Sequence, residues 1–256
     1  MTILLAADEL APVRILRPDG QSDFVLAVDH AGRLIPRALG DLGLEKSERR
    51  RHIAWDIGIA DVTEAMADLM DATAILQVYS RLVIDCNRAP GHPTAIPVMS
   101  ELTPIPGNEG LTDADRAARR AAIFDPYHAA ITELLDARQA SGRRTILVAM
   151  HSFTPVFKGV ARTVEVGVLY HHETQLSRLM LELLRAEGGL VVGANEPYAI
   201  TDTSDYTVPV HGEGRGLDHV EIEIRQDLIA DAAGQAAWAR RMARLLAAAD
   251  ERLRAG

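Results

Sequence analysis

The chain has 256 residues, 48% of them hydrophobic and 25% charged, which is enough for one large α/β core, so we expect a single domain over residues 1–256. A net charge of -9 argues against a nucleic-acid binder or an acidic-membrane binder. The one cysteine, Cys86, cannot form an intrachain disulfide. No segment approaches a membrane span or a signal peptide, which predicts a cytoplasmic protein.

Apolar runs alternate with amphipathic segments along the chain. Residues 24–28 predict a strand, and apolar positions at helical spacing predict a long helix over 47–70 that carries Asp56. Residues 74–78 and 82–84 resemble strands, and the proline- and glycine-rich stretch 90–110 predicts a long irregular loop. Further helices are expected over 111–139, 175–186 and 230–255, and further strands over 145–150, 164–169, 190–192 and 219–224. This order predicts an α/β fold with a mixed, largely parallel sheet, and neither a Walker loop nor a dinucleotide fingerprint is present.

Two of the predicted strands end in a histidine. His30 follows the run 24–28, and His151 follows the run 145–150. Ligands of such sheets bind beyond the carboxyl ends of the strands, so both imidazoles should lie at the functional edge and could hold a metal. The alternative is that each histidine is structural and hydrogen-bonded at a strand end.

A third metal ligand is needed for a catalytic zinc site, and Asp56 is the best candidate for it. The alternative for Asp56 is a surface carboxylate near a helix start. Asp29, beside His30, is a competing ligand or a partner of a ligand. His171 and His172 precede the predicted helix 175–186 and are interpreted as caps or surface groups rather than as ligands.

Two carboxylates lie two residues apart on the alternating strand 219–224. Glu221 and Glu223 therefore share one sheet face, and Glu223 lies deeper within the run. A carboxylate in a partly dry pocket is suited to act as a general base toward a metal-activated water. The alternative is an exposed face, or salt bridges to Arg225.

Three polar side chains gather around one strand and its exit loop: Arg81, Asn87 and Arg88. Guanidinium groups bind carboxylates through two parallel hydrogen bonds, which suits a substrate that carries carboxylates. A chain of net charge -9 repels such a substrate overall and would need a local basic pocket to bind it. The alternative is that both arginines are solvated surface charges.

Taken together, these motifs resemble the N-formylglutamate amidohydrolase family, and the resemblance covers most of the chain. The stretches that carry it are 28–36, 55–58, 80–88, 151–153, 195–198 and 220–225. The resemblance implies a three-layer α/β/α sandwich of the zinc-carboxypeptidase-like (phosphorylase/hydrolase-like) kind. It also implies a metal-dependent amidohydrolase for linear amides.

Carried over to this sequence, the resemblance makes His30, Asp56 and His151 the ligands of one Zn²⁺ and makes Glu223 the catalytic base. It also implies a clamp for the substrate carboxylates, formed by Asn87 with the arginines at 81 and 88. Further candidates for lining the pocket are Asp29, Ser152, His128, His211 and Glu221.

The expected substrate is a small acidic N-acylamino acid, first of all N-formyl-L-glutamate, which would yield glutamate and formate as in histidine degradation. Alternatives are a deacylase or peptide amidase for a different N-acylamino acid, and a non-catalytic binding protein on the same scaffold.

Overall fold

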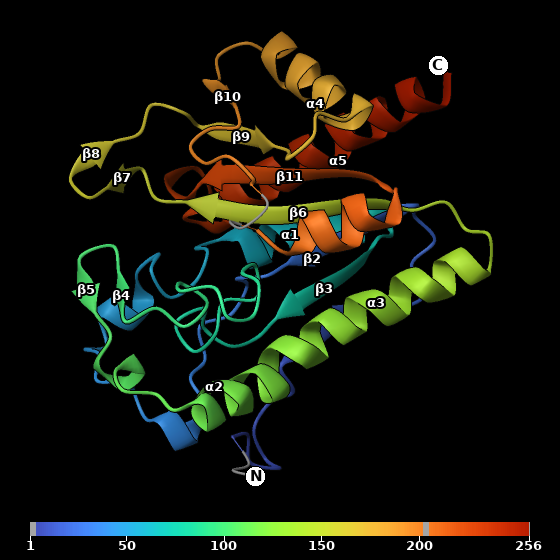
Figure 1. The fold of residues 1–256 in the computed structure, drawn as a ribbon. Helices are drawn as coiled ribbons and strands as arrows, with labels where there is room; N and C mark the ends of the chain where they lie inside the picture. The colour runs from blue at the N-terminus through green and yellow to red at the C-terminus, as the bar shows by residue number, and fades with distance from the viewer. Residues whose placement is uncertain (1–3, 202–204, 256) are drawn as a thin grey trace.

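A computed structural model describes residues 4–201 and 205–255 of the chain. In it, seven strands form one sheet in the order β1-β3-β2-β6-β11-β9-β10 (Figure 1). The strands β3, β2, β6 and β11 run parallel to one another, whereas β1 pairs antiparallel with β3 and β9 pairs antiparallel with β11. This arrangement confirms the predicted mixed, largely parallel sheet. The strands span Val13–Leu16 (β1), Phe24–Val28 (β2), Thr73–Gln77 (β3), Ile146–Phe153 (β6), Val166–Leu169 (β9), Val192–Ala194 (β10) and Asp218–Arg225 (β11).

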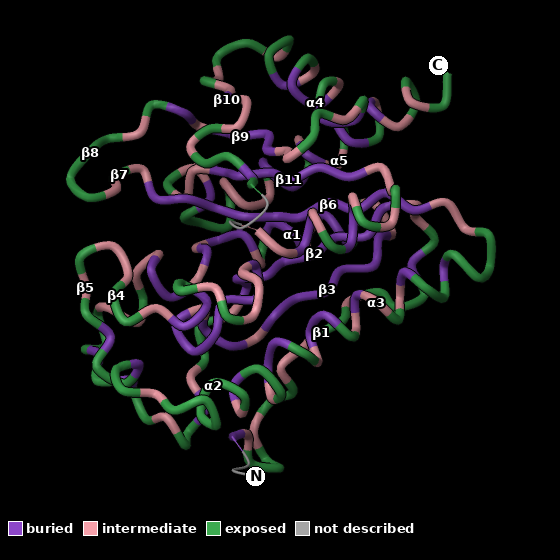
Figure 2. The backbone as a smooth tube through the Cα atoms, viewed as in Figure 1, coloured by how far each residue is buried: buried purple, intermediate pink, exposed green. Residues whose placement is uncertain are grey.

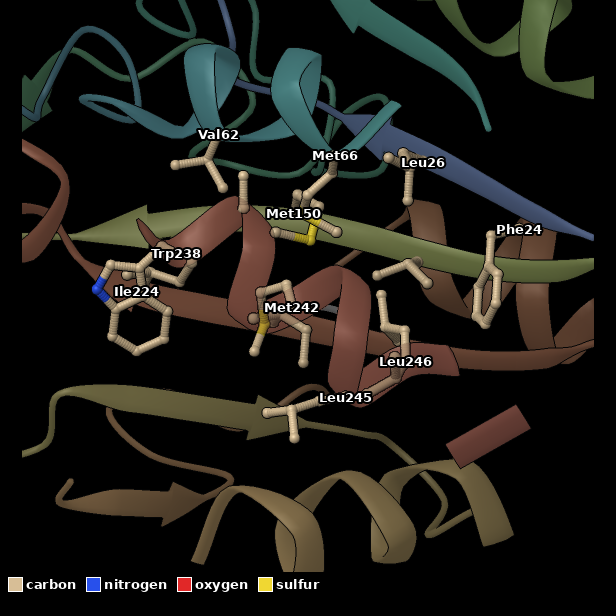
Figure 3. Packing of buried hydrophobic residues seen from close by; sticks show 14 of the residues in the cluster. Phe24, Leu26, Val62, Met66, Met150, Ile224, Trp238, Met242, Leu245 and Leu246 are labelled. Carbon is tan, nitrogen blue, oxygen red and sulfur yellow. The ribbon is translucent and has the colours of Figure 1, made fainter. Parts of the chain in front are cut away.

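Helices cover both faces of the sheet, so the three-layer sandwich is confirmed. One face packs against α1 (Ile59–Met70), α4 (Gln175–Ala186) and α5 (Ala232–Ala255). The other face packs against α3 (Asp125–Ala140), which continues from α2 (Asp113–Arg119) through one wider turn. Figure 3 shows Met66 of α1 and Met242 of α5 meeting Met150 of β6 in the first of these interfaces. In Figure 2 the central strands are buried along almost their whole length.

Strand alternation decides which side chains meet the helices and which meet the site. On β11, Val220, Ile222 and Ile224 join the core beneath α1, α4 and α5. The intervening residues of β11 point to the opposite face. His219, Glu221 and Glu223 are therefore buried on the face of the sheet opposite to α1, α4 and α5.

The helix predicted over 47–70 begins only at Ile59, so Asp56 lies in the turn before α1 rather than on the helix. The turn depends on Gly58, which has a φ of +82° and would place a Cβ only 2.3 Å from the carbonyl oxygen of Ile229. A side chain is excluded there by both the conformation and the contact. Helical spacing of apolar residues could not reveal this boundary.

The strand predicted over 82–84 is wrong. The Ser80 hydroxyl donates to the Ala54 carbonyl and accepts from the Leu82 amide, so the chain turns there instead of pairing. The expected loop 90–110 is largely irregular, with a short hairpin, Met99–Ser100 (β4) and Thr103–Pro104 (β5). A second hairpin, Val156–Phe157 (β7) and Val160–Ala161 (β8), follows β6. Among the described residues, no helix is long and apolar enough to cross a membrane.

Candidate metal centre

Three of the predicted site residues come together at the carboxyl end of the parallel strands. His30 follows β2, His151 lies near the end of β6, and Asp56 reaches both from the turn before α1. The Asp56 Oδ2 atom lies 3.0 Å from His151 Nδ1 and 3.5 Å from His30 Nδ1. All three residues are buried, and their potential ligand atoms lie within 4.8 Å of one another. The arrangement offers two nitrogens and one oxygen to a single point.

A second carboxylate holds the far nitrogen of each imidazole. Asp85 Oδ1 lies 2.7 Å from His30 Nε2, and Asp29 Oδ2 lies 3.2 Å from His151 Nε2. These carboxylates are themselves held, because Asp85 accepts from Arg81, and Asp29 accepts from the Thr207 hydroxyl at 2.5 Å. Carboxylates placed in this way fix the orientation and tautomer of metal-binding histidines.

The proton inventory of the cluster calls for a cation. If His30 Nε2–H donates to Asp85, His30 Nδ1 is left with a lone pair that faces Asp56. This nitrogen is buried and has no hydrogen-bond partner among the described residues. His151 faces a carboxylate oxygen at each of its two nitrogens. A divalent ion between the Nδ1 atoms and Asp56 would satisfy all three groups, so the residues present fit a metal.

The electrostatics of the buried groups agree with this need for positive charge. Burial alone would lower the pKa of His151. The charge of Glu221 and the contacts that His151 makes with Asp29 and Asp56 instead raise this pKa well above its usual value. Burial would raise the pKa of Asp29, but His151 lowers it to about 2. The pKa of Asp56 is lowered in the same way by the two imidazoles, against burial.

The two strand carboxyls stand beside this cluster. Glu223 pairs in register with His151 across β11 and β6, and Glu221 Oε2 lies 3.9 Å from His151 Nε2. Burial raises the pKa of Glu223 to about 7 and raises that of Glu221 well above its usual range. Neither Oε2 atom has a hydrogen-bond partner within the described part of the chain. Glu223 can therefore exchange a proton near neutral pH with a group in the cavity, whereas burial makes Glu221 hold its proton more tightly than an exposed carboxyl does.

The cluster forms the floor of a cavity of about 430 Å³. His30, Asp56 and His151 line it together with both strand carboxyls. Arg81, Asn87 and Arg88 line it as well, along with side chains from the loop 94–101. The volume suits a small molecule with a few polar groups.

A model of the N-formylglutamate amidohydrolase family matches residues 22–230. The match covers the two histidines, Asp56 and β11, and so includes every part of the centre described above. The chain belongs to the N-formylglutamate amidohydrolase family. None of the curated proteins matches the sequence.

Solved structures show the same fold. A gene product from Agrobacterium tumefaciens, Atu2144, is 39% identical over 98% of this chain and 99% of its own, with a TM-score of 0.94. An N-formylglutamate amidohydrolase from Ralstonia eutropha JMP134 is 23% identical over 96% of this chain and 100% of its own, with a TM-score of 0.69. The second likeness concerns the fold alone.

The three residues predicted to bind the substrate carboxylates line the pocket, but each also makes hydrogen bonds to other residues of the chain. Arg81 donates to Asp85 through Nε at 3.0 Å and Nη2 at 2.6 Å. Asn87 donates to Asp205 and accepts from the amides of residues 206 and 207, so its side chain fixes that segment. Arg88 reaches the Asn87 carbonyl at 2.9 Å and Asp205 at 3.3 Å.

The residues expected to line the pocket divide into two groups. Ser152 and Glu221 do line it. The lining does not include Asp29, His128 or His211 within the described chain. Asp29 instead contacts His151. His128 and His211 are hydrogen-bonded to each other at 2.9 Å, and His128 also bonds to the Cys86 carbonyl.

Two supporting residues were missed by the sequence interpretation: Asp85 and Thr207. Asp85 lies inside the motif 80–88, and its carboxylate between two basic side chains was the available signal. Thr207 lies 178 residues from its partner Asp29, and no local pattern marks it.

Proposed function

We propose that this family member is a zinc-dependent amidohydrolase that cleaves the N-acyl amide of an acidic amino acid, first of all N-formyl-L-glutamate. The observation that supports this most directly is the buried Nδ1 atom of His30, which faces Asp56 and has no hydrogen-bond partner among the described residues while Asp85 holds the opposite nitrogen. A bound cation would satisfy this nitrogen, which hydrogen bonds within the protein do not. The products would be glutamate and formate.

His30, Asp56 and His151 would hold the zinc ion, and the rest of the chain 1–256 would form one catalytic domain around them. When bound, zinc lowers the pKa of a coordinated water and polarises the acyl oxygen. Asp85 and Asp29 keep the two imidazoles in the tautomer that presents Nδ1 to the ion.

Glu223 would act as the general base and then as the general acid. It takes one proton from the attacking water, whose oxygen forms the new bond to the acyl carbon. As the carbon–nitrogen bond breaks, the same carboxyl delivers that proton to the leaving amine. Placement opposite His151 on the neighbouring strand supports this role.

Arg88 would bind a substrate carboxylate at the pocket wall. Arg81 lies deeper and is held by Asp85, so it would contribute charge and keep that carboxylate in place for His30. Asn87 would position the segment that carries Asp205 and Thr207. The substrate's position over the metal would follow from these contacts.

The substrate class is tested with purified, zinc-loaded protein. We expect the highest kcat/KM with N-formyl-L-glutamate among formyl-, acetyl- and succinyl-glutamate, the corresponding aspartates and short peptides. A preference for another acyl group or for peptides would show that the proposed substrate is wrong, but it would still support a hydrolase. Turnover of none of them by protein that binds zinc would favour a binding protein on this scaffold.

The role of Arg88 is tested with a matched pair of substrates. Arg88→Lys keeps the charge but loses the planar fork. It should lower kcat/KM more for N-formyl-L-glutamate than for N-formyl-L-glutamine, which keeps the α-carboxylate but has an uncharged side chain. An equal loss of kcat/KM for both substrates would show that Arg88 does not bind the side-chain carboxylate.

A further inference from the structure

A second group of histidines lies at the other end of the sheet. His171 and His172 follow β9, Glu213 begins the short turn Glu213–Arg215 (η6), and His219 opens β11. Because β9 runs antiparallel to β11, the residues after β9 lie beside the start of β11. The lining of the pocket, within the described chain, includes none of these four residues, although Glu221, two residues after His219, does line it. The group is therefore near the pocket but not part of it.

The carboxylate of Glu213 gathers the two consecutive histidines. Its Oε2 atom lies 3.0 Å from His171 Nδ1, and its Oε1 atom accepts the backbone amide of His172 at 3.1 Å. The two imidazole centroids are 4.1 Å apart. Each of the three residues offers a potential ligand atom within 4.8 Å of the others. Of the two roles predicted for these histidines, that of helix cap is wrong, because Thr174 caps α4, whereas the exposed position of His172 agrees with a surface group.

A buried histidine points into this group. His219 is 4% exposed, and its Nδ1 donates to the Leu217 carbonyl at 2.8 Å, which leaves a lone pair on Nε2. Nε2 lies 3.7 Å from Glu213 Oε1 and has no hydrogen-bond partner among residues 4–201 and 205–255. Gly212 permits this approach, since a Cβ there would lie 2.8 Å from His219 Cγ. The lone pair on the buried His219 Nε2 thus faces the partly exposed carboxylate of Glu213.

We propose that His171, His172 and Glu213, with His219 behind them, bind a second divalent transition metal of the zinc class. Imidazole and carboxylate ligands favour Zn²⁺ and its neighbours over Mg²⁺ and Ca²⁺. Ligand atoms about 2.0–2.1 Å from a tetrahedral zinc lie about 3.3 Å from one another. The 3.0 Å distance from Glu213 Oε2 to His171 Nδ1 is close to this value, and the other carboxylate oxygen, Oε1, lies 3.7 Å from His219 Nε2.

The site would join two parts of the fold. It lies where the connection from β9 to α4 meets the segment formed by Val208–Gly212 (η5) and η6, which appears orange across β6 in Figure 1. Thr207, whose hydroxyl donates a hydrogen bond to Asp29, directly precedes this segment. A metal here would fasten the segment that supports His151, without touching the pocket. The proposal does not depend on the proposed function.

Zinc titration of untagged, chelator-treated protein tests the proposal. We expect His171→Ala/His172→Ala to bind one Zn²⁺ fewer than wild type, as counted by calorimetry and metal analysis. His30→Ala/His151→Ala should retain the equivalent that the first variant loses. His92→Ala, in the loop 90–110, is the matched control and should keep the wild-type count.

A second measurement guards against misfolding. His172 is exposed, so His172→Ala alone should leave the fold intact and still weaken the second zinc affinity at least about tenfold. An unchanged zinc count and affinity in both variants would overturn the proposal. The group would then be a set of contacts around Glu213 that holds the two segments together without a metal.

Discussion

At the scale of single residues, Glu223 and Glu221 share burial and strand face but differ in their neighbours. Glu223 stands opposite His151 in register, whereas Glu221 stands opposite Ala149. Glu223→Gln keeps the shape and removes the proton acceptor, so we expect kcat to fall by about 10²–10⁴-fold with zinc content unchanged. Glu221→Gln should cause a smaller loss. The opposite ranking would make Glu221 the base, and loss of zinc in Glu223→Gln would make Glu223 a ligand.

The pair formed by His128 and His211 has a defined proton arrangement. His128 Nε2 lies 2.8 Å from the Cys86 carbonyl and therefore carries its proton, so His128 Nδ1 accepts from His211 Nε2. Burial and the neighbouring His128 lower the pKa of His211 from 6.5 to about 4. A lowered pKa means that protons bind the unfolded chain more readily than the folded one. Stability from this residue is complete above about pH 6.5 and is lost as the pH falls toward 4.

We therefore expect His211→Gln to flatten the pH dependence of unfolding. Between pH 7 and pH 4, wild type should lose up to about 3 kcal/mol more of its unfolding free energy than the variant does. Urea unfolding of both proteins at several pH values measures this difference. Parallel profiles would show that the histidine pair does not resist protonation.

At the scale of elements, the turn before α1 sets the position of Asp56. Gly58→Ala should destabilise the protein through its left-handed φ and through the contact with Ile229. Gly142→Ala is the matched control, because Gly142 has a φ of +68° and nothing within 4 Å of the added Cβ. We expect Gly58→Ala to cost at least about 1 kcal/mol more than the control. Zinc affinity should fall only in Gly58→Ala, and equal effects would show that the turn tolerates a side chain.

The sequence predicted elements whose signal is local and missed those whose cause lies far along the chain. The strand over 24–28 and the helix over 175–186 follow from apolar patterning, and both are confirmed at the predicted bounds. The turn before Ile59 depends on the Ile229 carbonyl, which lies on a distant segment. The pairing of Arg81 with Asp85, by contrast, joins residues only four positions apart, so it could have been predicted and was overlooked.

The candidate site shows the same division. Histidines at strand ends mark the edge of a parallel sheet, so the meeting of His30 and His151 could be predicted from two apolar runs. Their partners could not, because Asp85 lies 55 residues from His30, and Thr207 lies 178 residues from Asp29. Which carboxylate serves which imidazole is decided by tertiary packing. Adjacency in sequence favours Asp29 for His30, yet Asp29 holds His151.

At the scale of the whole molecule, the candidate metal centre joins four segments from the first 151 residues of the chain. Its residues come from β2, the turn before α1, the loop after β3, and β6. Without a cation, the carboxylates of Asp29, Asp56 and Asp85 surround two imidazoles in the interior. The imidazoles balance these carboxylates only while they are protonated, and because folding raises their pKa values, the stability gained in this way is lost as the pH rises. Metal binding should therefore stabilise the entire fold.

Chelation measures that stabilisation. A metal present at about 100 times its Kd adds about 2.7 kcal/mol, which corresponds to about 5–10 °C in Tm for a chain of this size. We expect a chelator to lower Tm by this amount in His171→Ala/His172→Ala, where the second group cannot contribute, and zinc to restore it. His30→Ala/His151→Ala should lack this component of the response. If His30→Ala/His151→Ala responds to the chelator as strongly as wild type does, the zinc that stabilises the protein is not bound at His30 and His151.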